Sequence, residues 1–298
     1  MPYAPKDLAA LYPVRPLPLA VLAIACGLLS ASTSPAGTHY DLYLLAGQSN
    51  MDGRGKAANL DPQQRQPSTS AIIFYRNPPA ASDGWQSLAP GYSIPPGYKG
   101  KVPSGTFGPE LGFAAGMLEA RKDRPLALIK GSKGGTSLAR DWNPGSKDDP
   151  NSQGPCYRNF IETVALACKE LERRGDTYEM RGVLWHQGES DANSPAEKYQ
   201  RELTSLVRRL REDLGKPDLP VVIGEVFDNG KRDAVRTAQK AAAKSIPHTA
   251  FAPAGGLKTW DHGTHFDAAS QLTLGRRFAE AMLQLESRID PAGKPTGS

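Results

Sequence analysis

Short apolar runs alternate with longer amphipathic stretches along the chain from about residue 38 onward. The apolar runs are continuous, as in Leu42-Tyr43-Leu44-Leu45, which is typical of strands buried on both faces of a sheet. The stretches between them repeat apolar residues at helical spacing. We expect strands at Tyr40–Ala46, Ala71–Tyr75, Pro125–Gly131, Gly182–His186, Leu219–Glu225 and Thr249–Pro253, and helices at Pro109–Arg121, Tyr157–Arg174, Pro195–Leu214, Asp233–Ser245 and Ala268–Leu285.

This order of strands and helices predicts an α/β fold, a three-layer α/β/α sandwich with a central parallel sheet. One such domain accounts for residues 38–288, and we expect residues 289–298 to form a disordered tail. Two long loops, Ser87–Phe107 and Ser132–Pro155, interrupt the alternation. Loops of that length in a compact domain are usually functional or disordered.

The first 36 residues read as a signal peptide and a short linker. Lys6 and Arg15 precede an apolar stretch, Leu17–Leu29, and small residues follow it, which is the order of a secretory signal. The sequence therefore predicts a secreted or periplasmic protein. A short uncleaved anchor and lipid attachment at Cys26 are alternatives, although the apolar pair Leu28-Leu29 argues against the lipid.

Pro16 and Pro18 interrupt the start of the apolar stretch of the leader, which is also too short for a comfortable membrane span. No later segment could cross a membrane, so we expect no stable span once the leader is removed. The chain carries a formal charge of +5, and no run of Lys and Arg concentrates it. Without a basic stripe, a nucleic-acid partner is not expected. The sequence leaves the oligomeric state open.

After the leader, Cys156 and Cys168 are the remaining cysteines. Both fall in the predicted helix at Tyr157–Arg174 or at its start, and residues twelve apart on a helix are separated by about 18 Å. That distance is too long for a disulfide. We expect two free, buried thiols.

Four polar clusters follow predicted strands or precede the last helix. The first is Gly47-Gln48-Ser49-Asn50-Met51, which places a hydroxyl at the end of a central strand, where Ser49 is either a nucleophile or a helix cap. The second, Gly131–Ser137, has glycines that let a backbone N–H approach a ligand closely, but its spacing does not fit a phosphate loop. The third and fourth are Trp185-His186-Gln187-Gly188-Glu189-Ser190-Asp191 and Trp260-Asp261-His262-Gly263-Thr264-His265-Phe266-Asp267.

The fourth cluster also invites a zinc interpretation, because it holds two histidines and two aspartates. No HExxH or CxxC partner accompanies it, and the other histidines lack ligand spacing. We therefore predict no metal and no cofactor. Taken together, the four clusters supply a hydroxyl, a base, carboxylates and oxyanion donors, which are the groups that acyl transfer needs.

These segments resemble the SGNH/GDSL-type hydrolase superfamily, and more closely its sialate O-acetylesterase-like and acetylxylan-esterase-like branch, carbohydrate esterase family six. The resemblance rests on the order and spacing of the four clusters, on Phe107-Gly108-Pro109-Glu110 and above all on the HQGES segment, and it covers nearly the whole mature chain. It implies a flavodoxin-like three-layer fold and metal-free hydrolysis of acetyl esters on a carbohydrate through an acyl-enzyme.

By this resemblance, Ser49 is the nucleophile and His265 the base. The backbone N–H groups of Ser49 and Gly135 (or Gly134) and the side-chain amide of Gln187 would form the oxyanion hole. Many relatives place an Asp three residues before the histidine, where this chain has His262, and Asp261 lies one position earlier. The Glu of the HQGE segment is an alternative acid.

We therefore rank Glu189 first and Asp261 second as the acid behind His265, since a histidine cannot replace the carboxylate. We expect Asn50 and Trp142 to contact the substrate, an acetylated carbohydrate, and aromatic residues in the long loops favour a sugar site. A small-ester hydrolase of broad specificity with the same fold is the nearest alternative function. An inactive glycan-binding protein is a more distant one.

Overall fold

The structure, a computed structural model, describes residues 37–261 and 263–289. The predicted signal peptide, Cys26, His262 and nearly all of the predicted tail lie outside the described residues. The secondary-structure elements run from His39 to Ile289 and belong to one compact unit.

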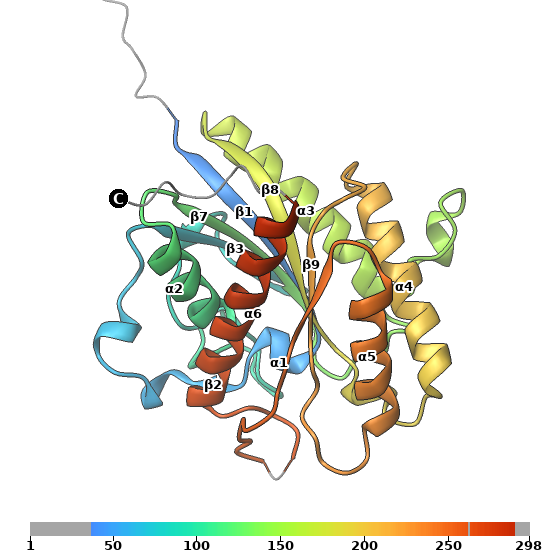
Figure 1. The fold of residues 1–298 in the computed structure, drawn as a ribbon. Helices are drawn as coiled ribbons and strands as arrows, with labels where there is room; N and C mark the ends of the chain where they lie inside the picture. Colours follow the sequence, from blue (N-terminus) through green and yellow to red (C-terminus); the bar gives the residue numbers. More distant parts are fainter. Residues whose placement is uncertain (1–36, 262, 290–298) are drawn as a thin grey trace, which may run out of the picture. The chain divides into compact units, whose positions relative to one another are not determined.

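A mostly parallel sheet forms the centre of this unit (Figure 1). Its strand order is β10-β9-β8-β1-β7-β3-β4, with β5 also pairing with β3. The neighbours from β10 to β3 are parallel, whereas β4 and β5 pair with β3 in antiparallel fashion. The strands are β1 (His39–Gly47), β3 (Ala71–Asn77), β4 (Ala80–Ala81), β5 (Gln86–Ser87), β7 (Leu126–Ser132), β8 (Thr177–His186), β9 (Val221–Gly224) and β10 (Thr249–Ala252).

Helices cover both faces of the sheet, as the continuous apolar strands predicted (Figure 1). On one face, Leu42 and Leu44 of β1 pack against α3 (Pro155–Arg173), α4 (Ala196–Asp213) and α5 (Asp233–Ser245). On the other, Tyr43 and Leu45 pack against α2 (Glu110–Ala120) and α6 (Ala268–Ile289). The predicted three-layer α/β/α fold is confirmed.

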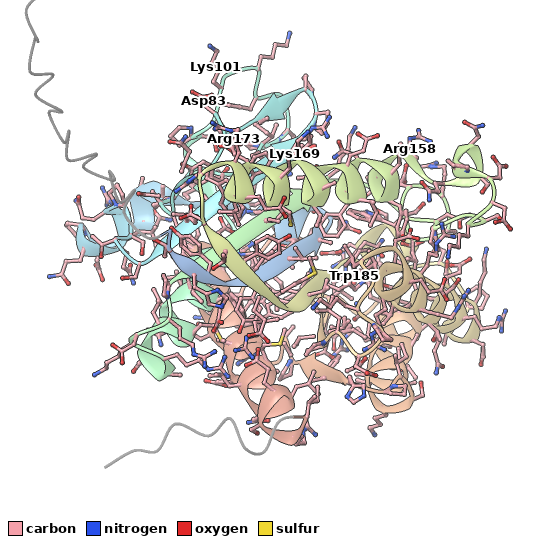
Figure 2. The ribbon with its side chains drawn as sticks, turned by 90° about the horizontal axis from the view of Figure 1, so that it is seen from above. Asp83, Lys101, Arg158, Lys169, Arg173 and Trp185 are labelled. Atoms are coloured by element: carbon pink, nitrogen blue, oxygen red, sulfur yellow. The ribbon has the colours of Figure 1, made fainter. Side chains whose placement is uncertain are left out.

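The long helix α3 shows why its segment was predictable from sequence. Figure 2 shows Arg158, Lys169 and Arg173 along its outer side, while Trp185 of β8 lies in the interior beneath it. Apolar residues of α3 such as Phe160 and Val164 face the sheet and are buried. This amphipathic spacing is the signal of a helix that covers a sheet.

Several short elements were not predicted. They are α1 (Ser49–Asp52), the two-stranded sheet of β2 (Gly55–Lys56) and β6 (Thr106–Phe107), and the short strands β4 and β5. Two-residue strands carry no periodicity that a sequence could reveal. Within the described residues Cys156 and Cys168 are free and buried, as expected, and burial raises the pKa of the Cys156 thiol to about 11. None of the described helices is long and apolar enough to cross a membrane.

The parallel register brings three polar segments to one edge of the sheet. Gly47 at the end of β1 pairs with Ser132 at the end of β7 on one side and with His186 at the end of β8 on the other. The segments that follow these strands therefore begin side by side. Carboxyl ends of strands on both sides of a central strand are where open α/β sheets form ligand sites.

Candidate active site

Ser49 lies at the first position of α1, directly after a tight turn at the end of β1. Gly47 has a φ of 148°, and a Cβ there would lie 2.0 Å from the carbonyl oxygen of His186. Only glycine allows this close approach between β1 and β8. As the first residue of a helix, Ser49 has a backbone N–H without an intrahelical acceptor, so this group is free to bind an anionic oxygen.

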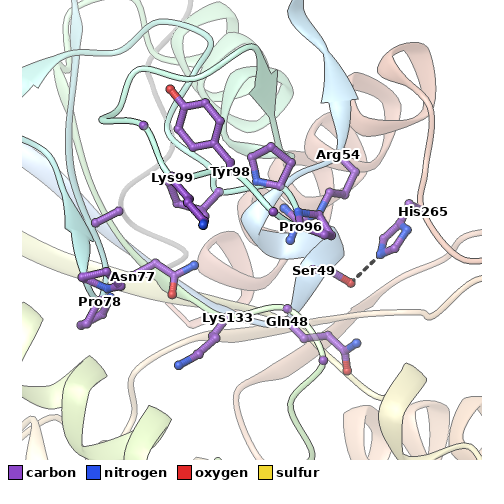
Figure 3. A pocket seen from close by; sticks show the side chains of 18 of the residues that line it. Gln48, Ser49, Arg54, Asn77, Pro78, Pro96, Tyr98, Lys99, Lys133 and His265 are labelled. Atoms are coloured by element: carbon purple, nitrogen blue, oxygen red, sulfur yellow. Dashed lines mark hydrogen bonds between the residues drawn. The ribbon is translucent and has the colours of Figure 1, made fainter.

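The structure brings Ser49, His265 and Asp261 together. His265 Nε2 lies 3.0 Å from Ser49 Oγ (Figure 3). On the other side of the ring, His265 Nδ1 lies 2.5 Å from Asp261 Oδ2. The carboxylate therefore contacts the ring nitrogen opposite the one that faces the hydroxyl. This is the geometry of a hydroxyl that is activated by an imidazole and oriented by an acid.

A closed loop before α6 explains how Asp261 reaches the ring from four residues away. Thr259 and Phe266 form an antiparallel bridge, and the backbone N–H of Trp260 donates to the carbonyl of His265. The loop thereby folds back on itself. Asp261 Oδ1 accepts the backbone N–H of His265 at 2.7 Å.

The surroundings of Asp261 favour its ionised form. Partial burial raises its pKa, but the hydrogen bonds from the backbone N–H and ring of His265 and the histidine charge outweigh that effect, and the pKa is lowered below its usual value. An ionised Asp261 can stabilise an imidazolium that forms during catalysis.

Glu189, which we ranked first as the acid, does not contact His265. Its Oε1 accepts a hydrogen bond of 2.6 Å from Asn50 Nδ2 and lies 3.9 Å from His186 Nδ1. Its Oε2 is buried without a partner among the described residues. The ranking is therefore wrong, because the loop closure gives the position behind the imidazole to Asp261.

Asn50, predicted to bind substrate, is fully buried and links the nucleophile segment to the histidine loop. Its Nδ2 donates to the carbonyl of Thr264 at 2.9 Å, and its Oδ1 accepts the N–H of Phe266 at 3.0 Å. Asn50 thus binds the peptide groups on both sides of His265. The prediction of substrate contact is wrong, since no part of the side chain is exposed.

Gln187 is fully buried, and its side-chain amide nitrogen already contacts hydrogen-bond acceptors within the protein. Its Nε2 lies 3.1 Å from Gln48 Oε1, 3.0 Å from the carbonyl of Thr136 and 2.5 Å from Asp191 Oδ2. No N–H remains for an oxyanion, so the predicted donor role is wrong. Gln187 instead ties Gln48, the neighbour of Ser49, to the loop that follows β7.

Gly134, in the loop after β7, lies against Ser49. A Cβ on Gly134 would lie 3.3 Å from Ser49 Cβ and 2.9 Å from Arg54 Nη2, so a side chain here would have to displace the Arg54 guanidinium. Gly135 has a φ of 73° and lines the same cleft as Ser49. The predicted oxyanion donors, the N–H groups of Ser49 and Gly135, therefore flank one space. Their role stays a prediction.

Arg54 is a residue that the sequence analysis missed. It is almost fully buried, yet it lines the cleft beside Ser49 (Figure 3). Its Nη1 lies 2.6 Å from Asp52 Oδ2 and donates to the carbonyl of Gly53. Asp52 in turn accepts hydrogen bonds from Tyr75 and the N–H of Ile94. The Arg54 guanidinium is thus held by the buried Asp52 carboxylate in the cleft that Ser49 also lines.

A second buried cation, Lys130 of β7, supports the same region. Its Nζ donates to Glu110 Oε2 at 2.8 Å and to the backbone carbonyls of Asp52 at 2.6 Å and Tyr92 at 2.9 Å. Both Lys130 and Glu110 are fully buried. The end of α1 and the start of the loop after β5 are therefore fastened to the central sheet.

Ser49 and His265 line a cleft of about 1400 Å³, and Tyr98 from the first long loop lines its wall (Figure 3). Trp142, predicted to bind substrate, is only 1% exposed and packs in the core against Phe160 and Trp185. That prediction is wrong, because the loop after β7 folds inward at Trp142.

Among residues 37–261 and 263–289, no group of three or more His, Cys, Asp and Glu side chains is arranged to hold a metal ion. Asp261 of the fourth cluster contacts His265 instead, and His265 contacts Ser49. What this arrangement can do chemically is proton transfer from a serine hydroxyl and attack on a carbonyl carbon.

Comparison with known proteins identifies relatives of this chain. The family model described as carbohydrate esterase, sialic acid-specific acetylesterase, matches residues 39–284. A probable carbohydrate esterase of Arabidopsis thaliana is 26% identical over 258 residues, which cover 81% of this chain and 90% of that protein.

Solved structures show the same fold. The X-ray structure of the Arabidopsis thaliana protein superposes with a TM-score of 0.64 at 25% identity, covering 82% of this chain and 98% of the other. A carbohydrate acetylesterase from Xanthomonas citri gives a TM-score of 0.58 at 22% identity, covering 85% of this chain and 57% of the other. NanS gives a TM-score of 0.58 at 16% identity, covering 85% and 99%.

Proposed function

Because the chain belongs to the sialic acid-specific acetylesterase family of carbohydrate esterases, and is thus a carboxylic ester hydrolase, we propose that it removes O-acetyl groups from a carbohydrate with Ser49 as nucleophile. The observation that carries the proposal is the contact chain from Asp261 through His265 to Ser49. In this set of contacts the hydroxyl of Ser49 has a base beside it, and the base has a carboxylate behind it, as nucleophilic catalysis requires.

The reaction proceeds in two steps through an acetyl-enzyme. Ser49 Oγ attacks the acetyl carbonyl carbon as His265 Nε2 takes its proton, and the N–H groups of Ser49 and Gly135 bind the oxyanion. His265 then gives the proton to the departing sugar oxygen. In the second step water attacks the acetyl carbon, His265 takes the water proton and returns it to Ser49, and acetate leaves.

The charge of the cleft favours an acidic sugar such as a sialic acid over neutral acetylxylan. Basic side chains outnumber acidic ones along its lining, and several of them stand on the exposed rim. A cleft lined by one sign of charge raises the local concentration of substrates of the opposite sign. Apart from Arg54, whose charge is offset by Asp52, the basic residues are Lys99, Lys101, Lys133 and Arg232, and the acidic ones are Asp83 and Glu189.

The test compares wild type with Ser49→Ala on p-nitrophenyl acetate, O-acetylated sialic acid, acetylated xylan and glucose pentaacetate. We expect wild type to release acetate fastest from the acidic sugar, with a kcat/KM that falls as salt rises, because salt screens the rim charges. Equal rates for wild type and Ser49→Ala on every substrate would contradict the esterase proposal and would favour an inactive glycan-binding protein. A preference for p-nitrophenyl acetate over all sugars would indicate an esterase of broad specificity.

A further inference from the structure

Trp260 is an exposed indole beside the catalytic histidine. It is 49% exposed, whereas Trp85, Trp142 and Trp185 are 7%, 1% and 1% exposed. Its ring stacks on that of His265 with the centroids 6.0 Å apart and the planes 20° apart. His265 lines the catalytic cleft, so the indole stands next to the cleft on the histidine side.

Support for His265 does not account for this exposure. A side chain that only held the imidazole in place could be packed on its other surfaces, as the three buried tryptophans are. Instead a large apolar surface faces water at the edge of an enzyme's reacting centre. Tryptophan is enriched at binding interfaces, where its ring packs on apolar groups while its N–H finds a polar partner.

The chemistry of the indole suits a sugar. The face of the indole that is not stacked on His265 can pack against the C–H groups of a pyranose ring, and the indole N–H can donate to a hydroxyl. Lys56 Nζ lies 5.7 Å from the centre of the Trp260 ring and adds a positive charge and a hydrogen-bond donor at the same place. The pair offers both apolar and polar contacts to one sugar unit.

The position of the indole makes that unit a neighbour of the acetylated one. Ser49 contacts His265, and His265 contacts Trp260, so only one side chain separates the nucleophile from the indole. The sugar that carries the acetyl group must present it to Ser49 from the cleft. A sugar on Trp260 then lies on the other side of the histidine.

We propose that Trp260 and Lys56 form a second sugar-binding subsite, and that the substrate is an oligosaccharide or longer glycan in which an unreacted unit rests on Trp260. This inference rests on the proposed function and extends it from a single acetylated sugar to a chain of at least two units.

The first test measures how the preference for longer substrates depends on the indole. Wild type, Trp260→Ala and Trp260→Phe are assayed on O-acetylated sialic acid, free and at the end of a trisaccharide, and on acetylated xylose and xylotetraose. We expect wild type to prefer the longer member of the pair it hydrolyses, through a lower KM. In Trp260→Ala the ratio of kcat/KM for long over short substrate falls about tenfold, and Phe restores part of it.

The ratio separates sugar binding from support of the histidine. Weaker support of His265 lowers the rates on both substrates alike and leaves the ratio unchanged. Leu166→Ala, which removes an equally exposed apolar side chain from α3, serves as the control and leaves all rates as in wild type. An unchanged ratio in Trp260→Ala, or no preference for length in wild type, would overturn the proposal.

The second test does not need catalysis. In Ser49→Ala, the deacetylated trisaccharide and xylotetraose are titrated while tryptophan emission is recorded, since Trp260 is the exposed one of the chain's four tryptophans. We expect a saturable shift with one of the two that is lost in Ser49→Ala/Trp260→Phe. No shift, or the same shift in both proteins, would contradict the subsite. Binding without ester hydrolysis by wild type would instead reject the proposed function and keep the subsite.

Discussion

Asp261 contacts His265 with both of its carboxylate oxygens, one on the ring Nδ1 at 2.5 Å and one on the backbone N–H at 2.7 Å. The first contact fixes which ring nitrogen faces Ser49. The second fixes where the backbone of the histidine lies. One side chain therefore sets both the position and the orientation of the base, and this requires the tight loop in which the two residues lie.

The identity of the acid is the first prediction. Asp261→Asn should lower kcat on p-nitrophenyl acetate on the order of 10⁴-fold, because an amide neither stabilises an imidazolium nor favours the correct tautomer. Glu189→Gln should lower it less than about tenfold, since a Gln oxygen still accepts from Asn50. A large loss in Glu189→Gln together with a small one in Asp261→Asn would reverse the assignment.

The pH dependence of stability follows from the lowered pKa of Asp261. A carboxyl whose pKa is lower in the folded than in the unfolded protein stabilises the fold above its unfolded pKa and loses this contribution as pH falls through the folded value. The excess stability of wild type over Asp261→Asn should therefore be present above the ordinary carboxyl pKa of 3.8 and shrink as the pH falls below it. Urea unfolding measures it, with the exposed Asp148→Asn as control.

Asn50→Ala should lower kcat about 10- to 100-fold and leave KM unchanged. The substitution removes the hydrogen bonds to the peptide groups on both sides of His265, and small misplacements of a catalytic group cost that much. Steady-state kinetics on p-nitrophenyl acetate and one sugar acetate measure both constants. A raised KM with kcat intact would restore the original prediction that Asn50 touches the substrate.

Gln187→Leu should lower the free energy of unfolding by about 2–4 kcal/mol, because Gln48, Thr136 and Asp191 lose a donor in the interior. Gln66→Leu, at an exposed position, should change it by less than about 0.5 kcal/mol. Urea titrations followed by circular dichroism give both values. If Gln187→Leu were as stable as wild type but its kcat fell about 10²–10³-fold, Gln187 would be an oxyanion donor after all.

The layers of the fold and the meeting of Ser49 with His265 were predictable because they depend on periodicity and on the common edge of parallel strands. The identity of the carboxylate behind His265 was not predictable, because it depends on the loop closure between Thr259 and Phe266, which has no local sequence pattern.

The direction in which a polar side chain points could not be predicted from the sequence either. Gln187 follows a strand at the right edge, yet its amide turns into the interior.

Trp142 illustrates the same limit for aromatic residues. A tryptophan in a glycine-rich loop looks the same in the sequence whether its side chain faces a ligand or the core. The structure buries Trp142 and exposes Trp260, and only the packing of the surrounding chain distinguishes them.

Lys130 donates hydrogen bonds to three partners, and with two of them, Asp52 and Tyr92, the acceptor is a backbone carbonyl. A carbonyl is present whatever residue stands at the position, so this attachment places no demand on the side chains of the loop after β5. The stretch from Pro95 to Lys101, which lines the cleft beyond the core residue Ile94, can therefore be varied while the start of the loop stays attached to the sheet. A library confined to that stretch is therefore the natural route to new substrate selectivity in this scaffold.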